Sequence, residues 1–284
     1  MHHCKRMYAV PRIYLLDEND VIREYTLPRS SAIGSAMSNI SVIGDSKQLN
    51  HQSTQRKLIS QWRGEFNHVV KRFVVGPYDK SIYSVERGAD GFDIIYIKPI
   101  AGKTNWDVMV NLPPVLIEDI TLGMTKSTFN YMFISAQVKN KFGIYALTLS
   151  GNAALVASGV PKTRSVNMTD SESFSDFDEP PKNLLFNLLE ESLYFSYKKT
   201  LYRYQMATRK IQIIKSFSGD ITSMAQDIGW DKIVVVVNKQ DIHFVSLIGD
   251  KSHQVHLHPK MPKISSIMIW EDQLIVADSV FYRN

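Results

Sequence analysis

The sequence predicts an all-β fold, a six-bladed β-propeller of four-stranded antiparallel blades that forms a single domain over residues 1–284. Short hydrophobic runs separated by turn residues come in groups of four, at a spacing of about 40–45 residues, which is typical of propeller blades. The groups begin near Ile120, Leu184, Ile221 and Ile264. One blade cannot bury both faces of its sheet, so blades pack around a central channel. The first and last blades are the least well marked.

Two of these groups show all four expected strands. The first comprises Leu184–Leu188, Leu193–Tyr197, Leu201–Tyr204 and Ile211–Ile214. The next comprises Ile221–Ala225, Ile233–Val237, Ile242–Leu247 and Gln254–His258. Four consecutive valines, Val234–Val237, favour a strand that is apolar on both faces and therefore lies in the middle of a blade.

The earlier part of the chain continues this pattern. Ile13–Leu16 and Val21–Leu27 flank Asp17–Asp20, which predicts a hairpin that ends at Pro28. Further strands are expected at Asn39–Ile43, Phe73–Val75, Ile82–Val85, Phe92–Lys98 and Trp106–Val110. The blade that follows comprises Ile117–Leu122, Tyr131–Ala136, Ile144–Leu149 and Ala153–Ala157. Two polar stretches, at about 45–72 and 158–182, are interpreted as long loops.

Charge and composition limit the kinds of partner that this protein is expected to bind. The net charge of +5 and the pI of about 9.1 favour acidic partners. No run of Lys and Arg is long enough to form a basic arm, so we expect no nucleic-acid partner. No apolar run approaches the roughly 20 residues that span a bilayer, so no membrane partner is expected. The sequence does not indicate an oligomeric state.

The evidence on the cellular compartment is divided. The single cysteine, Cys4, excludes an internal disulfide, and Met1–Val10 lacks the apolar core of a signal peptide. Asn39 and Asn167 each begin an Asn-X-Ser/Thr glycosylation sequon, which points instead to a secreted glycoprotein. The alternatives are an intracellular protein, or a secreted one whose signal peptide is not present in this chain.

Several segments resemble, in order, the Yellow/major royal jelly protein family of insects. They are Pro11–Asp17 with Val21–Tyr25, Ser38–Ile40, Gly91–Tyr96 with Trp106, Asp119–Leu122 with Tyr131–Phe133 and Ile144–Leu147, Leu193–Phe195, and Leu274–Phe281. The chain departs from the family in lacking paired cysteines, and Ser279 stands where the family has an asparagine. The resemblance implies a secreted six-bladed propeller, here divergent and shortened at its N-terminus.

The resemblance also implies a ligand site in the central channel. Some members of the family bind small amines there, and the late strand supplies a polar group and an aromatic ring. In this sequence those residues are Ser279 and Phe281, with Ser265 from the innermost strand of the same blade and Asp119 from another. Phe281 would stack on an aromatic ligand or face a cation. The alternative interpretation is that Phe281 lies in the core and that the serines lie in turns.

Catalytic and metal sites are less well supported. Asp119, Asp227 and Asp278 could line one channel, but no spacing rule brings them together. His256 and His258 lie two residues apart, as two metal ligands on a strand would, but an exposed edge strand is the preferred interpretation. No nucleophile elbow, phosphate-binding loop, dinucleotide fingerprint or zinc-protease motif is present. We therefore expect no cofactor and no metal.

Three functions follow from these observations. The first is a secreted, Yellow-like propeller that binds a small aromatic or amine ligand. The second is a dopachrome-converting enzyme of melanin formation. The third is a non-enzymatic propeller that binds other proteins.

Overall fold

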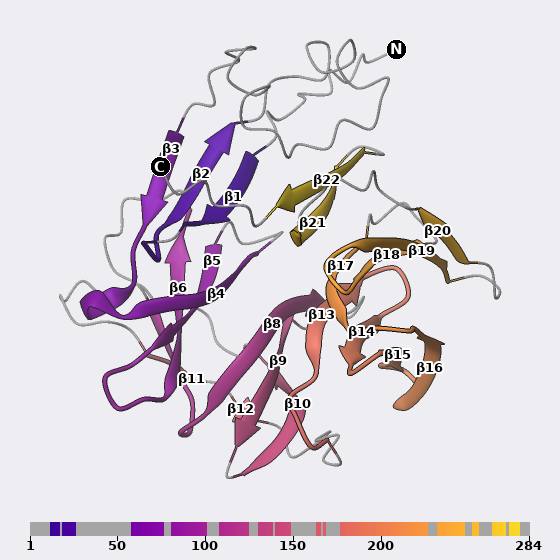
Figure 1. Ribbon diagram of the computed structural model, residues 1–284. Coiled ribbons are helices and arrows are strands. Elements are labelled where there is room, and N and C mark those ends of the chain that lie inside the picture. The colour runs from indigo at the N-terminus through magenta and orange to yellow at the C-terminus, as the bar shows by residue number, and fades with distance from the viewer. Residues whose placement is uncertain are drawn as a thin grey trace, which may run out of the picture.

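The computed structural model of the chain is all-β (Figure 1). It describes residues 12–17, 19–26, 58–76, 81–100, 108–124, 130–138, 140–148, 163–165, 167–168, 177–226, 232–247, 252–255, 263–270 and 273–278. These residues form 22 strands and one short 3-10 segment, η1 (Glu65–Asn67). Within these residues there is no helix that is long and apolar enough to cross a membrane.

The strands form six sheets, numbered here in chain order. Sheet 1 contains β1 (Arg12–Leu16), β2 (Ile22–Thr26) and β3 (Leu58–Trp62). Sheet 2 contains β4 (Val69–Val75), β5 (Ser81–Arg87), β6 (Asp93–Pro99), β7 (Val108–Asn111) and β11 (Thr163–Ser165). Sheet 3 contains β8 (Leu116–Met124), β9 (Asn130–Val138), β10 (Lys141–Thr148) and β12 (Asn167–Met168).

The second half of the chain builds the remaining three sheets. Sheet 4 contains β13 (Lys182–Asn187), β14 (Ser192–Tyr197), β15 (Thr200–Gln205) and β16 (Lys210–Ser216). Sheet 5 contains β17 (Ile221–Gln226), β18 (Lys232–Val237), β19 (Asp241–Ser246) and β20 (Ser252–Val255). Sheet 6 contains β21 (Ile264–Trp270) and β22 (Gln273–Asp278). Among the named strands, β11 and β7 form the one parallel pair, and the other pairs are antiparallel.

The predicted groups of four strands are confirmed in sheets 3, 4 and 5, whereas sheet 6 has two strands among the described residues. Sheets 3 to 6 begin at Leu116, Lys182, Ile221 and Ile264, close to the predicted starts. The N-terminal hairpin is confirmed as β1 and β2. Its turn is held by Asp17, whose Oδ1 accepts the backbone N–H groups of Asn19 at 2.9 Å and Val21 at 3.0 Å. The strand expected at Gln254–His258 begins earlier, at Ser252.

The prediction of two long loops is wrong in part. Residues 45–72 contain β3, η1 and the start of β4, and residues 158–182 contain β11, β12 and the start of β13. Both β3 and β11 lie at the outer edge of a sheet, where main-chain hydrogen bonds hold a strand that needs few apolar side chains. The strands expected at Asn39–Ile43 and Ala153–Ala157 lie outside the described residues.

Each hydrophobic cluster joins two successive sheets. The five clusters fill the interfaces between sheets 1 and 2, 2 and 3, 3 and 4, 4 and 5, and 5 and 6. In β18, Ile233, Val235 and Val237 face sheet 4, and Val234 and Val236 face sheet 6. This alternation follows from the two-residue period of a strand. It confirms that the valine run occupies the middle of a sheet, where each buried side chain contributes about 1.5–3 kcal/mol.

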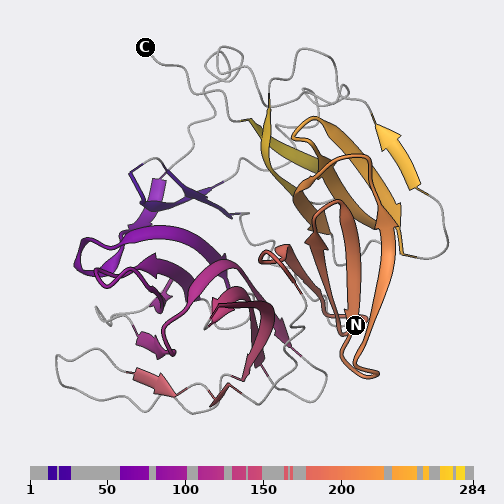
Figure 2. The same ribbon diagram turned by 60° about the horizontal axis from the view of Figure 1, so that its bottom comes forward.

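The first strand of each of sheets 2 to 6 lies on the inside. Strand β8 contacts β4 and β13, and β17 contacts β13 and β21, so these five inner strands follow one another in space. Figure 2 shows the sheets succeeding one another around the molecule, from indigo through magenta and orange to yellow. None of the five clusters contains residues of both sheet 6 and sheet 1.

Candidate functional site

Each of the five inner strands carries a β-bulge near its start. The register against the second strand breaks between Val70 and Arg72, Ile117 and Asp119, Lys182 and Leu185, Ile221 and Ser223, and Ile264 and Ser266. The residues inside the breaks are Lys71, Glu118, Asn183 with Leu184, Thr222, and Ser265. A bulged residue leaves the ladder, and the bulge re-aims the side chains beside it. The same irregularity therefore recurs at the inner end of five sheets.

Asp93 joins sheet 2 to sheet 3 at the first of these bulges. Its side chain is 0% exposed. Its Oδ2 accepts the backbone N–H of Ile117 at 2.6 Å and Lys71 Nζ at 2.8 Å, and its Oδ1 accepts Arg87 Nε at 2.6 Å. Lys71 Nζ also donates to the Ile117 carbonyl at 2.8 Å. A buried carboxylate needs such a complete set of donors, because an unpaired buried charge is costly.

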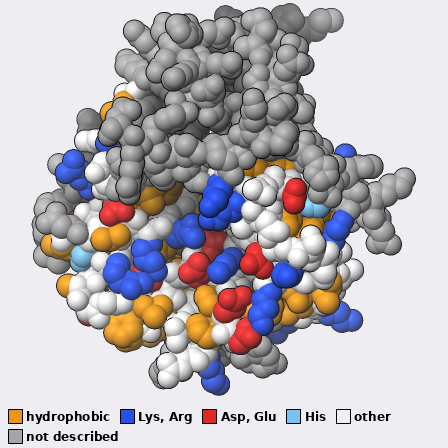
Figure 3. Space-filling view, in the orientation of Figure 1, with side chains coloured by type: hydrophobic (Ala, Val, Ile, Leu, Met, Phe, Trp, Pro, Cys, Tyr) orange, Lys and Arg blue, Asp and Glu red, His pale blue; other side chains and the backbone are white. Residues whose placement is uncertain are grey.

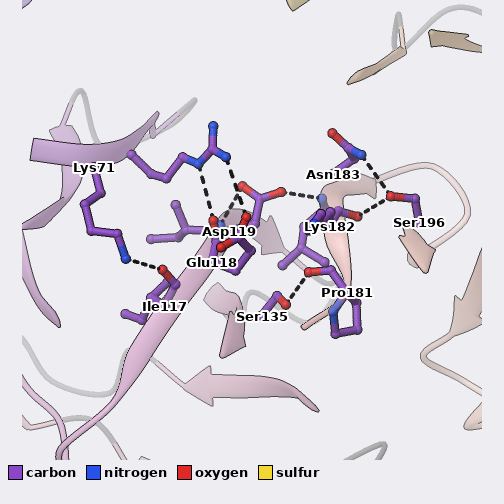
Figure 4. Close-up of polar contacts among 12 residues, drawn as sticks. Lys71, Ile117, Glu118, Asp119, Ser135, Pro181, Lys182, Asn183 and Ser196 are labelled. Carbon is purple, nitrogen blue, oxygen red and sulfur yellow. Dashed lines mark hydrogen bonds and ion pairs between the residues drawn. The ribbon is translucent and has the colours of Figure 1, made fainter. Parts of the chain in front are cut away.

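Asp119 makes the corresponding link between sheets 3 and 4. Its Oδ2 accepts the backbone N–H of Leu184 in β13 at 2.8 Å, and its Oδ1 accepts that of Ile120 at 2.9 Å (Figure 4). Burial raises the pKa of Asp119, although the Leu184 N–H and the nearby Arg72 guanidinium oppose that rise. Arg72 Nε donates to the Glu118 carbonyl at 3.3 Å, so β4 is also tied directly to β8.

Neutral side chains continue the links around the inner strands. The Asn183 amide donates to the Ser196 hydroxyl at 2.8 Å and to the Ile221 carbonyl of sheet 5 at 3.1 Å. The Ile267 N–H of sheet 6 donates to the Ser223 hydroxyl of sheet 5 at 3.3 Å. Side chains beside the bulges therefore bind main-chain groups of the next sheet at four successive interfaces, from sheet 2 to sheet 6. We call this set of contacts the inner polar ring.

A second buried polar cluster lies on the opposite face of sheet 2, toward sheet 1. Lys98 Nζ and Glu86 Oε1 form an ion pair at 3.0 Å, and both side chains are almost fully buried. Glu86 also accepts the Ser84 hydroxyl at 2.7 Å and the Glu65 backbone N–H at 2.7 Å. Lys98 Nζ donates to the Arg63 carbonyl at 3.0 Å. The cluster thus fixes the segment that connects β3 to β4.

The residues predicted to bind a ligand or to be glycosylated lie in different parts of the fold. Asp119 lies on the inner strand β8, as expected, and its two oxygens bind the main chain. Ser265 lies on the inner strand β21, at the bulge. Asn167 lies in β12, at the outer edge of sheet 3. Ser279, Phe281 and Asn39 lie outside the described residues.

Of the other candidate carboxylates and histidines, only Asp278 lies within the described residues. Asp278 ends β22, whereas Asp227, His256 and His258 lie outside the described residues. Among the residues that are described, no three His, Cys, Asp or Glu side chains are grouped as metal ligands.

Asp93, Lys71 and Arg87 were missed by the reasoning from sequence. They lie on three different strands, and only the fold brings them together. The single local signal is an aspartate at the first position of a strongly apolar strand. In the space-filling view, acidic and basic side chains mix in the middle of the described face, over the region of β4, β8 and β13 (Figure 3).

No protein-family profile and no curated protein matches this sequence. Among solved structures, the chain is similar to Raptor of Chaetomium thermophilum, with 10% sequence identity and a TM-score of 0.53 over 92% of this chain and 21% of that one. It is also similar to a chain of the mitotic checkpoint complex, with 11% identity and a TM-score of 0.49 over 94% of this chain and 68% of that one. The chain therefore spans about a fifth of the Raptor chain. At this identity the Raptor match shows the fold alone, and that fold is propeller-like.

Proposed function

We propose that this chain is a non-enzymatic propeller that binds another protein. The observation that carries the proposal is the exposure of two large apolar side chains on the outer strand of sheet 4. Ile211 is 43% exposed and Ile213 is 61% exposed. Exposed apolar side chains that lie together on a folded domain are typical of protein-binding surfaces.

The inner polar ring supports this proposal in a second way. The carboxylates of Asp93 and Asp119 accept hydrogen bonds that join successive sheets, which makes the sheets a rigid support. Rigid scaffolds that present binding groups at their rims and loops are common among binding proteins. These hydrogen bonds between sheets are sufficient to explain why Asp93 and Asp119 are present, without a catalytic role.

We further propose that the six sheets close into a six-bladed ring. Five interfaces are filled by hydrophobic clusters, and a sixth, between sheets 6 and 1, would bury the faces of these two sheets that the five clusters do not cover. Both sheets lie in the upper half of the molecule in Figure 1. A closed domain of this length should give a radius of gyration of about 19 Å in small-angle X-ray scattering. A clearly larger value with an elongated profile would indicate an open arc.

Affinity purification tests the protein-binding function. The full chain, carrying a terminal tag, is incubated with an extract of its own source. The complexes are washed at about 0.3 M salt, because a basic protein collects acidic proteins by charge alone and salt screens that attraction. The expected result is one partner in a fixed ratio, measured by mass photometry of the eluted complex.

An unrelated propeller of similar pI serves as the control. A partner that both proteins retain would be nonspecific. If no protein co-purifies at a fixed ratio with this chain, the proposed function is wrong.

Ligand binding in the channel is a second candidate, and one observation favours it. The bulge in β21 takes Ser265, a residue of an inner strand, out of the strand ladder. Together with the resemblance to the Yellow family, this supports a secreted, glycosylated protein that binds a small aromatic or amine ligand. Calorimetry with serotonin, dopamine and histamine tests it, and saturable heat that Ser265→Ala reduces is expected. Loss of dopachrome absorbance above the buffer rate would indicate an enzyme instead.

A further inference from the structure

Strand β16 is an outer edge strand. Two of its isoleucines extend rows of side chains that run from the core across neighbouring strands of sheet 4. Strand β16 is the last strand in the order β13-β14-β15-β16, and no strand among the described residues pairs with its other side. Ile211 lies opposite Tyr204, and Ile213 lies opposite Tyr202. Tyr202 stacks on Phe195 with its ring centroid 5.3 Å away, at an angle of 8° between the rings. Each row therefore begins with buried residues and ends at an exposed isoleucine.

In sheet 2, this chain itself adds a fifth strand at the outer edge. Strand β11 pairs in parallel with β7, the fourth strand of that sheet. The added strand is only three residues long. The outer edge of a sheet in this fold thus accepts extended chain through main-chain hydrogen bonds. Strand β16, at seven residues, offers a longer edge of the same kind.

The charge around β16 indicates what kind of strand would bind. Arg209, Lys210 and Lys215 lie on or beside the strand, and no Asp or Glu occurs between Arg203 and Asp220. A second copy of this chain would place two identical basic sets against each other, which is unfavourable. An acidic partner strand would be attracted instead.

From these observations we infer that β16 binds an extended segment of a protein partner by strand addition. The segment has apolar side chains at alternate positions, which pack on Ile211 and Ile213, and acidic residues at its ends. Main-chain hydrogen bonds supply affinity in this mode, and the alternating side chains supply specificity. This inference rests on the proposed protein-binding function and names the surface that carries it.

A synthetic peptide tests the inference directly. The probe is a fluorescent peptide of alternating valine and threonine with two glutamates at each end, and the comparison peptide has lysines in place of the glutamates. Fluorescence anisotropy with the full chain should show saturable binding of the acidic probe and binding of the lysine peptide that is at least tenfold weaker. Ile213→Glu should weaken binding of the acidic probe roughly tenfold or more, because it places a charge in the apolar row.

Leu189→Glu is the matched control, because Leu189 is as exposed as Ile213 but lies in a turn. It should leave binding unchanged, and both variants should show the wild-type melting temperature. Amide hydrogen exchange should show new protection in residues 210–216 when the acidic probe binds. Equal binding of both peptides, equal loss in both variants, or self-association that Ile213→Glu abolishes would each overturn the inference.

The partner complex from the affinity purification separates this inference from the general function. If Ile213→Glu releases the partner and Leu189→Glu does not, the inference is supported. If both variants retain the partner, the protein-binding function stands and the β16 surface is wrong.

Discussion

Asp119 Oδ2 accepts the backbone N–H of Leu184 at 2.8 Å, across 65 residues of sequence. This hydrogen bond joins the inner strand of sheet 3 to the inner strand of sheet 4. It depends on the bulge beside Asp119, because the register break changes where the following side chains point. A local irregularity in one sheet is therefore coupled to the position of the next.

Removing the Asp119 carboxylate should destabilise the protein. Asp119→Ala leaves the N–H groups of Leu184 and Ile120 without their acceptor, and an unsatisfied buried donor costs about 1–3 kcal/mol. Urea unfolding should show a lower midpoint with an unchanged slope. Glu118→Ala is the control, since Glu118 is 36% exposed and forms a long ion pair of 3.9 Å with Arg72. A loss in Glu118→Ala as large as that in Asp119→Ala would contradict the role given to Asp119.

The same residue should give stability an unusual pH dependence. Burial raises the pKa of Asp119 above its unfolded value of 3.8, so between the two values the folded state binds more protons than the unfolded state. The contribution of this residue to stability is therefore largest below pH 3.8 and is lost as the pH rises through the folded pKa. The difference in unfolding free energy between wild type and Asp119→Asn should accordingly shrink as the pH rises from 3.8 through the folded pKa.

Asp17 provides the matched control of opposite sign. Burial alone would raise the pKa of Asp17. The N–H of Val21, the Arg23 side chain and the N–H of Asn19 together hold this pKa below 3.8. Its contribution is present above pH 3.8 and is lost as the pH falls through the folded pKa. The difference between wild type and Asp17→Asn should therefore grow as the pH rises. Parallel curves for the two variants would contradict both assignments.

Much of the sheet structure could be predicted, because a strand buried on both faces needs apolar residues at nearly every position. Val234–Val237 and Leu193–Tyr197 are such strands, and turn residues bound both of them. Strand β3 could not be found in this way, because Leu58 and Ile59 are exposed on an outer edge and main-chain bonds to β2 hold the strand. Sequence patterns report side-chain burial, and they carry little information on edge pairing.

The inner polar ring was not predictable, with the exception of Asp119. Asp93, Lys71 and Ile117 meet across three strands, and the residues in the five bulges share no residue type. Asp119 was placed on an inner strand by its position before an apolar run, but its partner Leu184 follows from the contact between sheets. Polar links of this kind depend on tertiary geometry, which a single sequence does not display.

The buried ion pair of Glu86 and Lys98 should show strong coupling. Lys98→Met removes the cation from a carboxylate that is fully buried, and breaking such a pair by removing one partner typically costs about 3–5 kcal/mol. The double variant Glu86→Leu with Lys98→Met should lose clearly less than the sum of the single variants, because it leaves no unpaired charge. Arg72 and Glu118 form the exposed comparison pair, for which a coupling of at most about 1 kcal/mol is expected. Additive losses at Glu86 and Lys98 would show that the ion pair does not couple them.

Gly123 in β8 should tolerate no side chain, because two aromatic rings lie against its backbone. A Cβ atom there would lie 2.8 Å from Phe186 Cγ and 2.9 Å from Phe133 Cε2. These two rings stack with centroids 5.5 Å apart, so neither can move without disturbing the interface between sheets 3 and 4. Gly123→Ala should therefore cost about 1–3 kcal/mol in thermal or urea unfolding, the usual range for overpacking.

A second substitution separates this clash from a simple backbone effect. Phe186→Ala removes the Cγ and Cδ1 atoms at the point of contact and should itself destabilise the protein. If the clash is the cause, adding Gly123→Ala to Phe186→Ala should cost less than Gly123→Ala costs in the wild type. Equal costs in the two backgrounds would locate the effect in the backbone of β8, and the close approach of Phe186 to Gly123 would then not be what requires glycine at this position.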